Sequence, residues 1–138
     1  MSVVKRGQCL CGAVRISATL PDETLEICHC TMCQAWVGGP YVATQMTAEA
    51  RIEGEEHVRL YRSSDHAERA FCDTCGSALY FRYLPTGNRS FLAGLFADLA
   101  GPIQEEIFID QKPAWLSIEG DRPRLTRAEV LAKFGFDE

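Results

Sequence analysis

The feature that most constrains this chain is the placement of its seven cysteines, which fall in three tight groups and nowhere else among 138 residues. The groups are a first pair, Cys9 and Cys11, a triplet, Cys28, Cys30 and Cys33, and a second pair, Cys72 and Cys75. A disulfide framework favours an even count in a secreted chain, and cysteines that only fill a core scatter along the sequence. The clustering therefore favours metal ligation over both of these alternatives.

The two pairs together predict one closed metal site. CLCG and CDTCG each supply two thiolates that can bind one tetrahedral ion, and zinc–sulfur bonds are about 2.3 Å long. Cys9 and Cys11 share one face of an extended chain, whereas Cys72 and Cys75 suit a tight turn in which Gly76 adopts a positive φ. Four protein ligands leave no position for a substrate, so we expect a structural zinc here.

The stretch CHCTMCQ, from Cys28 to Gln34, offers three soft ligands without a fourth. Three thiolates with one open tetrahedral position are typical of a catalytic zinc, so we interpret Cys28, Cys30 and Cys33 as a second, labile and functional site. His29 is an alternative fourth ligand, although in an extended chain it points away from its two neighbours and is then hydrogen-bonded or solvent-facing. A further alternative is that the three thiols bind metal weakly or not at all.

The composition predicts one soluble globular domain spanning residues 1–138, since 46% of residues are hydrophobic and 24% are charged. The formal charge is −5 and no run of Lys or Arg occurs, which argues against nucleic acid as a partner. The N-terminal residues MSVVKRGQC lack an apolar signal segment, and no membrane span is expected. We therefore expect a cytoplasmic protein; the sequence gives no oligomeric state.

Alternating and apolar runs predict a mainly β fold built of small antiparallel sheets. In residues 13–18, Val14 and Ile16 are expected to face a core, and in residues 57–62, Val58 and Leu60 share one face. Three more runs have strand length and are separated by turn residues: 77–84, 89–96 and 105–110.

One short helix is expected near the C-terminus, in LTRAEVLAKFG. Thr126 has the position of an N-cap residue, and Glu129 would complete a capping box. Leu125 and Val130 would form a hydrophobic staple, and Gly135 would end the helix.

The order CLCGAV, CHCTMCQ, FCDTCGSALYF and then KPAWL, over about residues 7–118, resembles the glutathione-dependent formaldehyde-activating enzyme family. The resemblance implies the zinc-bearing, mostly β Mss4-like fold, with a structural zinc on the two pairs and a functional zinc on the triplet. It also implies carbon–sulfur lyase chemistry on a thiol–aldehyde adduct such as S-hydroxymethylglutathione. The alternative is a noncatalytic zinc module that binds a protein or a small thiol.

An anionic partner such as glutathione needs local cations, because ionised thiols add to a net charge that is already negative. Five cationic residues are candidates by type alone, with solvated surface positions as the more usual role: Arg15, Arg62, Arg69, Arg82 and Lys112. Four aromatic residues are candidates for a pocket wall, with core packing as the more usual role: Trp36, Tyr41, Phe81 and Trp115.

Overall fold

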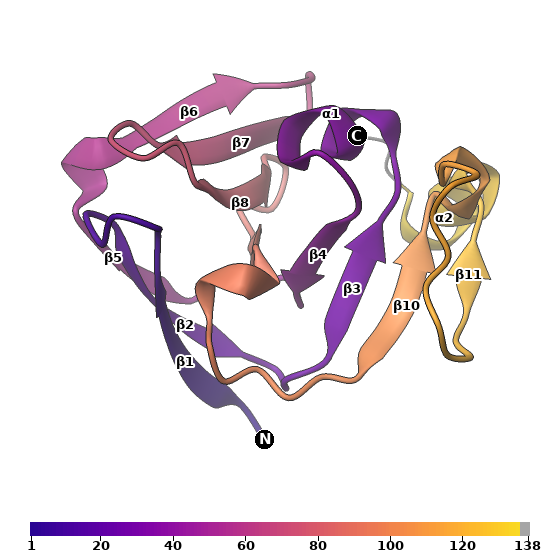
Figure 1. The fold of residues 1–138 in the computed structure, drawn as a ribbon, viewed down its shortest axis with the longest axis horizontal. Coiled ribbons are helices and arrows are strands. Elements are labelled where there is room, and N and C mark those ends of the chain that lie inside the picture. The colour runs from indigo at the N-terminus through magenta and orange to yellow at the C-terminus, as the bar shows by residue number, and fades with distance from the viewer. Residues whose placement is uncertain (136–138) are drawn as a thin grey trace.

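Three small sheets account for most of the regular structure in the computed structural model, which describes residues 1–135 (Figure 1). The N-terminal sheet is antiparallel, in the order β1-β2-β5. Its strands are β1 (Val3–Gln8), β2 (Arg15–Leu20) and β5 (Ala50–Glu53). Val14 and Ile16 are buried, as the alternation predicted, while Arg15 and its neighbours on the outer face meet solvent.

A second antiparallel sheet has the order β6-β7-β8-β9, each strand pairing with the next along the chain. Its strands are β6 (Val58–Arg62), β7 (Ala67–Cys72), β8 (Ala78–Tyr83) and β9 (Arg89–Phe91). On the edge strand β6, Val58 packs against the first hydrophobic cluster, whereas Leu60 on the same face is 49% exposed. The run 89–96 is not one strand, since a 3₁₀ turn (η2, Ala93–Leu95) follows β9.

The third sheet departs from the antiparallel expectation. Its order is β11-β10-β3-β4, and its strands are β3 (Leu25–Cys28), β4 (Tyr41–Thr44), β10 (Ile103–Ile107) and β11 (Arg124–Leu125). β3 pairs antiparallel with β4, but β10 pairs parallel with both β3 and β11. The sheet is therefore mixed, and its parallel pairs join segments that are far apart in sequence.

Two α-helices lie beside this mixed sheet (Figure 1). Helix α1 (Thr31–Val37) directly follows β3. Helix α2 (Arg127–Phe134) follows β11 and confirms the predicted C-terminal helix. Thr126 and Glu129 form the expected capping box, and Gly135 ends the helix with a φ of 74°.

In the described part of the chain, the remaining regular elements are two short 3₁₀ turns, η1 (Glu55–His57) and η3 (Ile109–Gln111). Among residues 1–135, no helix is long and apolar enough to cross a membrane.

The buried residues form two hydrophobic clusters, and each one contains cysteines. The first lies between the N-terminal sheet and the second sheet and contains Cys9 and Cys72. The second contains Cys28, Cys30 and Cys33, together with side chains of β4, β8 and α2. The fold thus places the two groups of thiols in separate parts of the core.

Candidate metal centres

The two cysteine pairs meet in space, and we call them the four-cysteine cluster: Cys9, Cys11, Cys72 and Cys75. Their four Sγ atoms all lie within 4.8 Å of one another. The Sγ of Cys11 is 3.7 Å from that of Cys9 and 3.9 Å from that of Cys72. A tetrahedron with metal–sulfur bonds of about 2.3 Å has edges of about 3.8 Å. All four thiols are free, so their spacing fits a tetrahedral zinc and not a disulfide.

Local turns bring these four sulfurs together. The first pair lies in the loop after β1, where the N–H of Val14 donates to Cys9 Sγ over 3.3 Å. The second pair lies in the turn between β7 and β8, where Gly76 has the expected positive φ of 76°. The N–H of Gly76 donates to the carbonyl of Cys72 rather than to a sulfur. A bond of 3.0 Å from Leu10 N–H to Ser77 Oγ joins the two loops.

The thiols of the four-cysteine cluster differ strongly in acidity. A hydrogen bond with Ser77 Oγ, at 3.2 Å, is the main cause that lowers the pKa of Cys75 to about 5. The backbone N–H of Ala13 favours the Cys11 thiolate, but burial and the neighbouring sulfurs outweigh it and raise the pKa of Cys11 to about 11. The Cys11 thiol therefore resists ionising beside the other sulfurs, and a divalent cation bound there would remove this repulsion.

The triplet forms a second group, the three-cysteine cluster: Cys28, Cys30 and Cys33. Their Sγ atoms also lie within 4.8 Å of one another. Cys28 ends β3, Cys30 is the N-cap of α1, and the N–H of Cys33 donates to Cys30 Sγ over 3.3 Å. Cys28 lies before this N-cap residue and Cys33 lies in the first turn of the helix. The start of α1 therefore positions all three sulfurs. The donor set fits a soft cation such as zinc.

The three-cysteine cluster is less exposed than a labile site suggests. Cys28, Cys30 and Cys33 are only 5%, 4% and 0% exposed. A cavity of about 70 Å³ reaches the cluster at Cys28. Its walls come from β3, β4, β8, β9, β10 and the residues after β4: Glu26, Cys28, Tyr41, Ala43, Thr44, Met46, Phe81, Ser90 and Ile107.

Glu26, a residue that the sequence did not single out, is the carboxylate in this cavity wall. Burial, with a smaller contribution from the charge of Glu105, raises the pKa of Glu26 above its ordinary value. Its position two residues before Cys28 on β3 carries no motif. Only the pairing of β3 with β4 and β10 reveals its place in the wall.

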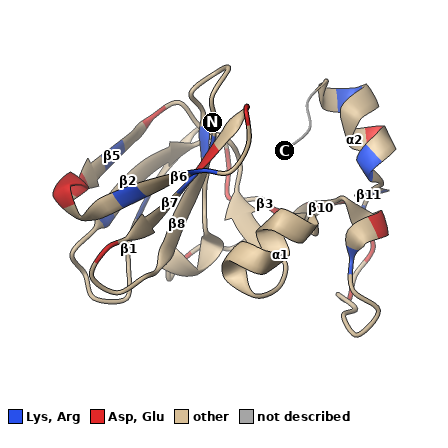
Figure 2. Ribbon diagram, turned by 90° about the horizontal axis from the view of Figure 1, so that it is seen from above, with Lys and Arg blue, Asp and Glu red and all other residues tan. Residues whose placement is uncertain are grey.

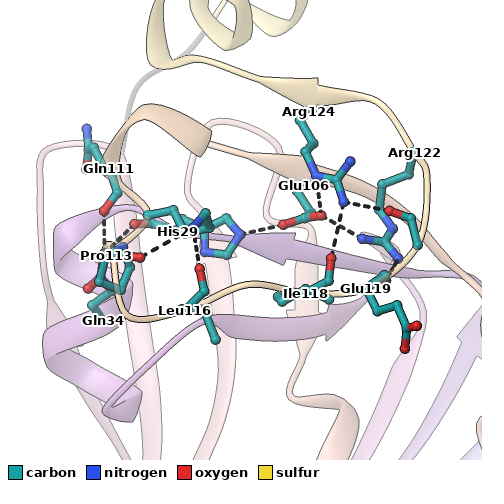
Figure 3. Close-up of polar contacts among 12 residues, drawn as sticks. His29, Gln34, Glu106, Gln111, Pro113, Leu116, Ile118, Glu119, Arg122 and Arg124 are labelled. Carbon is teal, nitrogen blue, oxygen red and sulfur yellow. Dashed lines mark hydrogen bonds and ion pairs between the residues drawn. The ribbon is translucent and has the colours of Figure 1, made fainter.

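His29 is hydrogen-bonded to another side chain and does not belong to the three-cysteine cluster. It is fully buried, and its Nε2 lies 2.8 Å from Glu106 Oε1 (Figure 3). Its backbone N–H donates to Ile107 O over 3.0 Å, and its carbonyl accepts from Gln34 Nε2 over 2.7 Å. The residue between two candidate ligands thus anchors their loop to β10.

Glu106 connects this histidine to the segment that follows η3. Its Oε2 accepts from Arg122 Nη1 over 2.7 Å and from Arg124 Nε over 2.9 Å (Figure 3). Burial disfavours the charged form, but bonds from His29 and Arg122 and the charge of Arg124 hold the pKa of Glu106 below its ordinary value. No sequence motif indicates this network, because the residues around Glu106 predict only a strand.

Of the five candidate cations, Arg69 is buried beside the three-cysteine cluster. Its Nη1 donates to Cys33 Sγ over 3.3 Å. The other four bond to backbone carbonyls or lie on the outer sheet face. Arg62 contacts Ser64 and Asp65, Arg82 contacts Gly87, Lys112 contacts Pro113 and Leu116, and Arg15 is exposed.

Three of the four candidate aromatic residues gather at the same place. Trp36 of α1 stacks on Tyr41 of β4 with ring centroids 5.5 Å apart. Tyr41 and Phe81 line the cavity. Helix α1 carries no Lys, Arg, Asp or Glu (Figure 2), so the charges at this site come from the strands. Trp115 is 75% exposed and does not line the cavity.

Known proteins are similar to this chain over most of its length. The family model for glutathione-dependent formaldehyde-activating enzymes matches residues 4–111. An uncharacterized lyase of Schizosaccharomyces pombe is 34% identical over 127 residues, which cover 91% of this chain and 93% of that protein. A protein of Halomonas elongata, provisionally named as a glutathione-dependent formaldehyde-activating enzyme, is 30% identical over 96% of this chain and 97% of its own length.

A solved structure supports the fold. A crystal structure of a Rhodobacter sphaeroides protein aligns with a TM-score of 0.58 at 24% identity and covers 69% of this chain and 90% of that one. Taken with the family match over residues 4–111, these relatives establish that the chain belongs to the glutathione-dependent formaldehyde-activating enzyme family.

Proposed function

We propose that this protein is a zinc-dependent carbon–sulfur lyase that acts on a thiol–aldehyde adduct, with S-hydroxymethylglutathione as the adduct to test first. The observation that carries the proposal is the cavity at Cys28, which joins a three-thiol cluster to a small space. Family membership supports it, since relatives are named as a lyase and as a glutathione-dependent formaldehyde-activating enzyme. We assign the structural role to the four-cysteine cluster, because its four thiols can fill every position of a tetrahedral ion.

The reaction forms or breaks one carbon–sulfur bond. In the breaking direction, R–S–CH₂–OH gives a thiol and formaldehyde, and the hydroxyl proton is transferred to sulfur. Zinc held by Cys28, Cys30 and Cys33 would supply a Lewis acid that stabilises a thiolate or polarises an aldehyde oxygen. The protein's side chains then have to bind the hydroxymethyl group of the adduct and exclude bulk water.

The cavity walls suit such a group. About 70 Å³ is the space of a few water molecules, so a hydroxymethyl group fits and a tripeptide does not. Met46, Phe81 and Ile107 supply apolar surface, while Tyr41 Oη bonds to Ser90 O over 2.8 Å and contacts Ser90 Oγ at 2.9 Å. We therefore infer that the one-carbon group enters the cavity and that the peptide part of glutathione stays outside it.

Exchange NMR with ¹³C-formaldehyde and glutathione tests this function. Zinc-loaded protein is expected to speed exchange between free formaldehyde and the adduct above a protein-free blank, which is essential because thiols add to formaldehyde unaided. Cys30→Ser should abolish the acceleration, and Thr126→Ala, which alters only the cap of α2, should retain it. An exchange rate equal to the blank would contradict the lyase and favour a noncatalytic zinc module.

A further inference from the structure

Arg69 is the charged residue built most closely into the three-cysteine cluster. It lies on β7 and is only 3% exposed. Its Nη1 donates to Cys33 Sγ over 3.3 Å. Arg69 belongs to the second sheet, whereas the three cysteines lie at the end of β3, in the mixed sheet, and at the start of α1. The contact therefore joins two sheets across the second core cluster.

Two aromatic rings hold the guanidinium in place. The Cζ atom of Arg69 lies 5.0 Å from the centroid of Trp36 and 5.3 Å from that of Phe81. Phe81 is the direct cross-strand partner of Arg69, and Trp36 is itself fixed by stacking on Tyr41. Cation–π contacts of this kind strengthen when water is excluded. The planar group is thus oriented with an N–H directed at sulfur.

The charge of Arg69 matters because a guanidinium stays protonated at any physiological pH. Three thiolates and one divalent cation carry a net charge of −1, and a fourth thiolate makes it −2. Such an excess of negative charge is costly in a buried site unless a cation lies beside it. A neutral fourth ligand leaves the net charge at −1 and therefore needs less compensation than a fourth thiolate.

We propose that Arg69 is a positioning residue that orients Cys33 and offsets the thiolate charge, so that the three-cysteine cluster accepts an anionic sulfur as its fourth ligand. The inference rests on the proposed function for its choice of ligand, a small thiol bound as thiolate. It also explains how a protein of net charge −5 tolerates another anion at this point. The residue acts through Cys33 and the bound ion, not on the reacting carbon.

Cobalt substitution tests this without measuring turnover. Co²⁺ replaces zinc, and the near-ultraviolet thiolate-to-cobalt absorption is followed while 2-mercaptoethanol is added. Arg69→Gln removes the charge and keeps a donor, whereas Arg69→Lys keeps the charge. The dissociation constant for the thiol should rise about tenfold or more in the Gln variant and change less in the Lys variant. Titration with imidazole, a neutral ligand, should differ between the two variants by less than about threefold.

Arg82→Gln is the matched control, because Arg82 lies on the neighbouring strand and bonds only to the carbonyl of Gly87 among the contacts described for it. It should bind 2-mercaptoethanol like the wild type. Loss of cobalt from the three-cysteine cluster in Arg69→Gln, with the four-cysteine cluster still loaded, would also support the proposal. Equal thiol binding in the Gln and Lys variants would overturn it, as would a wild type that binds no thiol. Thiol binding without faster formaldehyde exchange would leave the role of Arg69 intact and reject the lyase.

Discussion

At the scale of single residues, the buried carboxylate of Glu106 has three charged or ionisable partners. Glu106 is 1% exposed and accepts from His29, Arg122 and Arg124, which lie before α1 and in the segment leading to α2. Breaking one member of such a network leaves the other charges buried without compensation. Through His29, these contacts stabilise the segment that carries Cys28 and Cys30.

Glu106→Gln is therefore expected to lower the free energy of unfolding by about 3 kcal/mol. Urea denaturation at pH 7 measures it, with Glu105→Gln as the control. Glu105 is adjacent on β10 but pairs with the half-exposed Lys133, so its replacement should cost no more than about 1 kcal/mol. Equal losses in the two variants would contradict the importance of the buried network.

Glu106 should also make the free energy of unfolding depend on pH. The folded-state pKa of Glu106 lies below its ordinary value. Its contribution to stability is hence complete above about pH 4.3, the usual pKa of a glutamate, and is lost as the pH falls through the folded-state value. The stability difference between wild type and Glu106→Gln should shrink below about pH 4. A difference that stays constant down to pH 3 would argue against this linkage.

The capping box at α2 gives a smaller residue-scale prediction. Thr126 Oγ accepts from Glu129 N–H over 3.2 Å, and Glu129 Oε1 accepts from Thr126 N–H over 2.9 Å. Thr126→Ala should cost about 1 kcal/mol and leave the metal content unchanged. Thermal denaturation measures the cost. A melting temperature within error of the wild type would mean that tertiary contacts, not the cap, hold α2.

At the scale of elements, the four-cysteine cluster joins the loop after β1 to the turn between β7 and β8. This contact links the N-terminal sheet to the second sheet across the first core cluster. Structural zinc sites contribute on the order of 10 kcal/mol to folding in small domains. We therefore expect a metal ion in this cluster to hold the two sheets in their mutual position.

Cys75→Ser should accordingly give an unstable or insoluble protein that loses the zinc of the four-cysteine cluster. The thiolate of Cys75 is the one most favoured by its surroundings, through Ser77. Circular dichroism on heating and zinc analysis measure the effect. A variant that melts like the wild type with unchanged zinc content would contradict the structural role of this cluster.

At the scale of the whole molecule, the two cysteine clusters lie in different hydrophobic clusters of the core. Loss of one ion therefore need not disturb the other. The three-cysteine cluster has one ligand fewer, and a less complete cage releases its ion more readily. Because the cluster is buried, we expect an ion bound there to exchange through the cavity at Cys28.

Graded chelation should hence remove one zinc first, while the fold persists. Cys30→Ser should lower the zinc content from about two toward one with little change in melting temperature, on the premise that three ligands hold the second ion. Serine suits this test because its oxygen can still cap α1. Joint loss of both metals, or an unfolded variant, would show that the three-cysteine cluster belongs to the scaffold.

The sequence by itself determined the features that are local: the grouping of the cysteines, the faces of β2, and the helix signals around Thr126 and Gly135. Each of these depends on spacing within a few residues, which periodicity and turn chemistry report directly. Only the tertiary structure decided that β10 runs parallel to β3, that Glu106 meets His29, and that Arg69 alone among the five candidate cations meets Cys33. The physical reason is that alternation tells which face of a strand is buried but not which strand lies beside it.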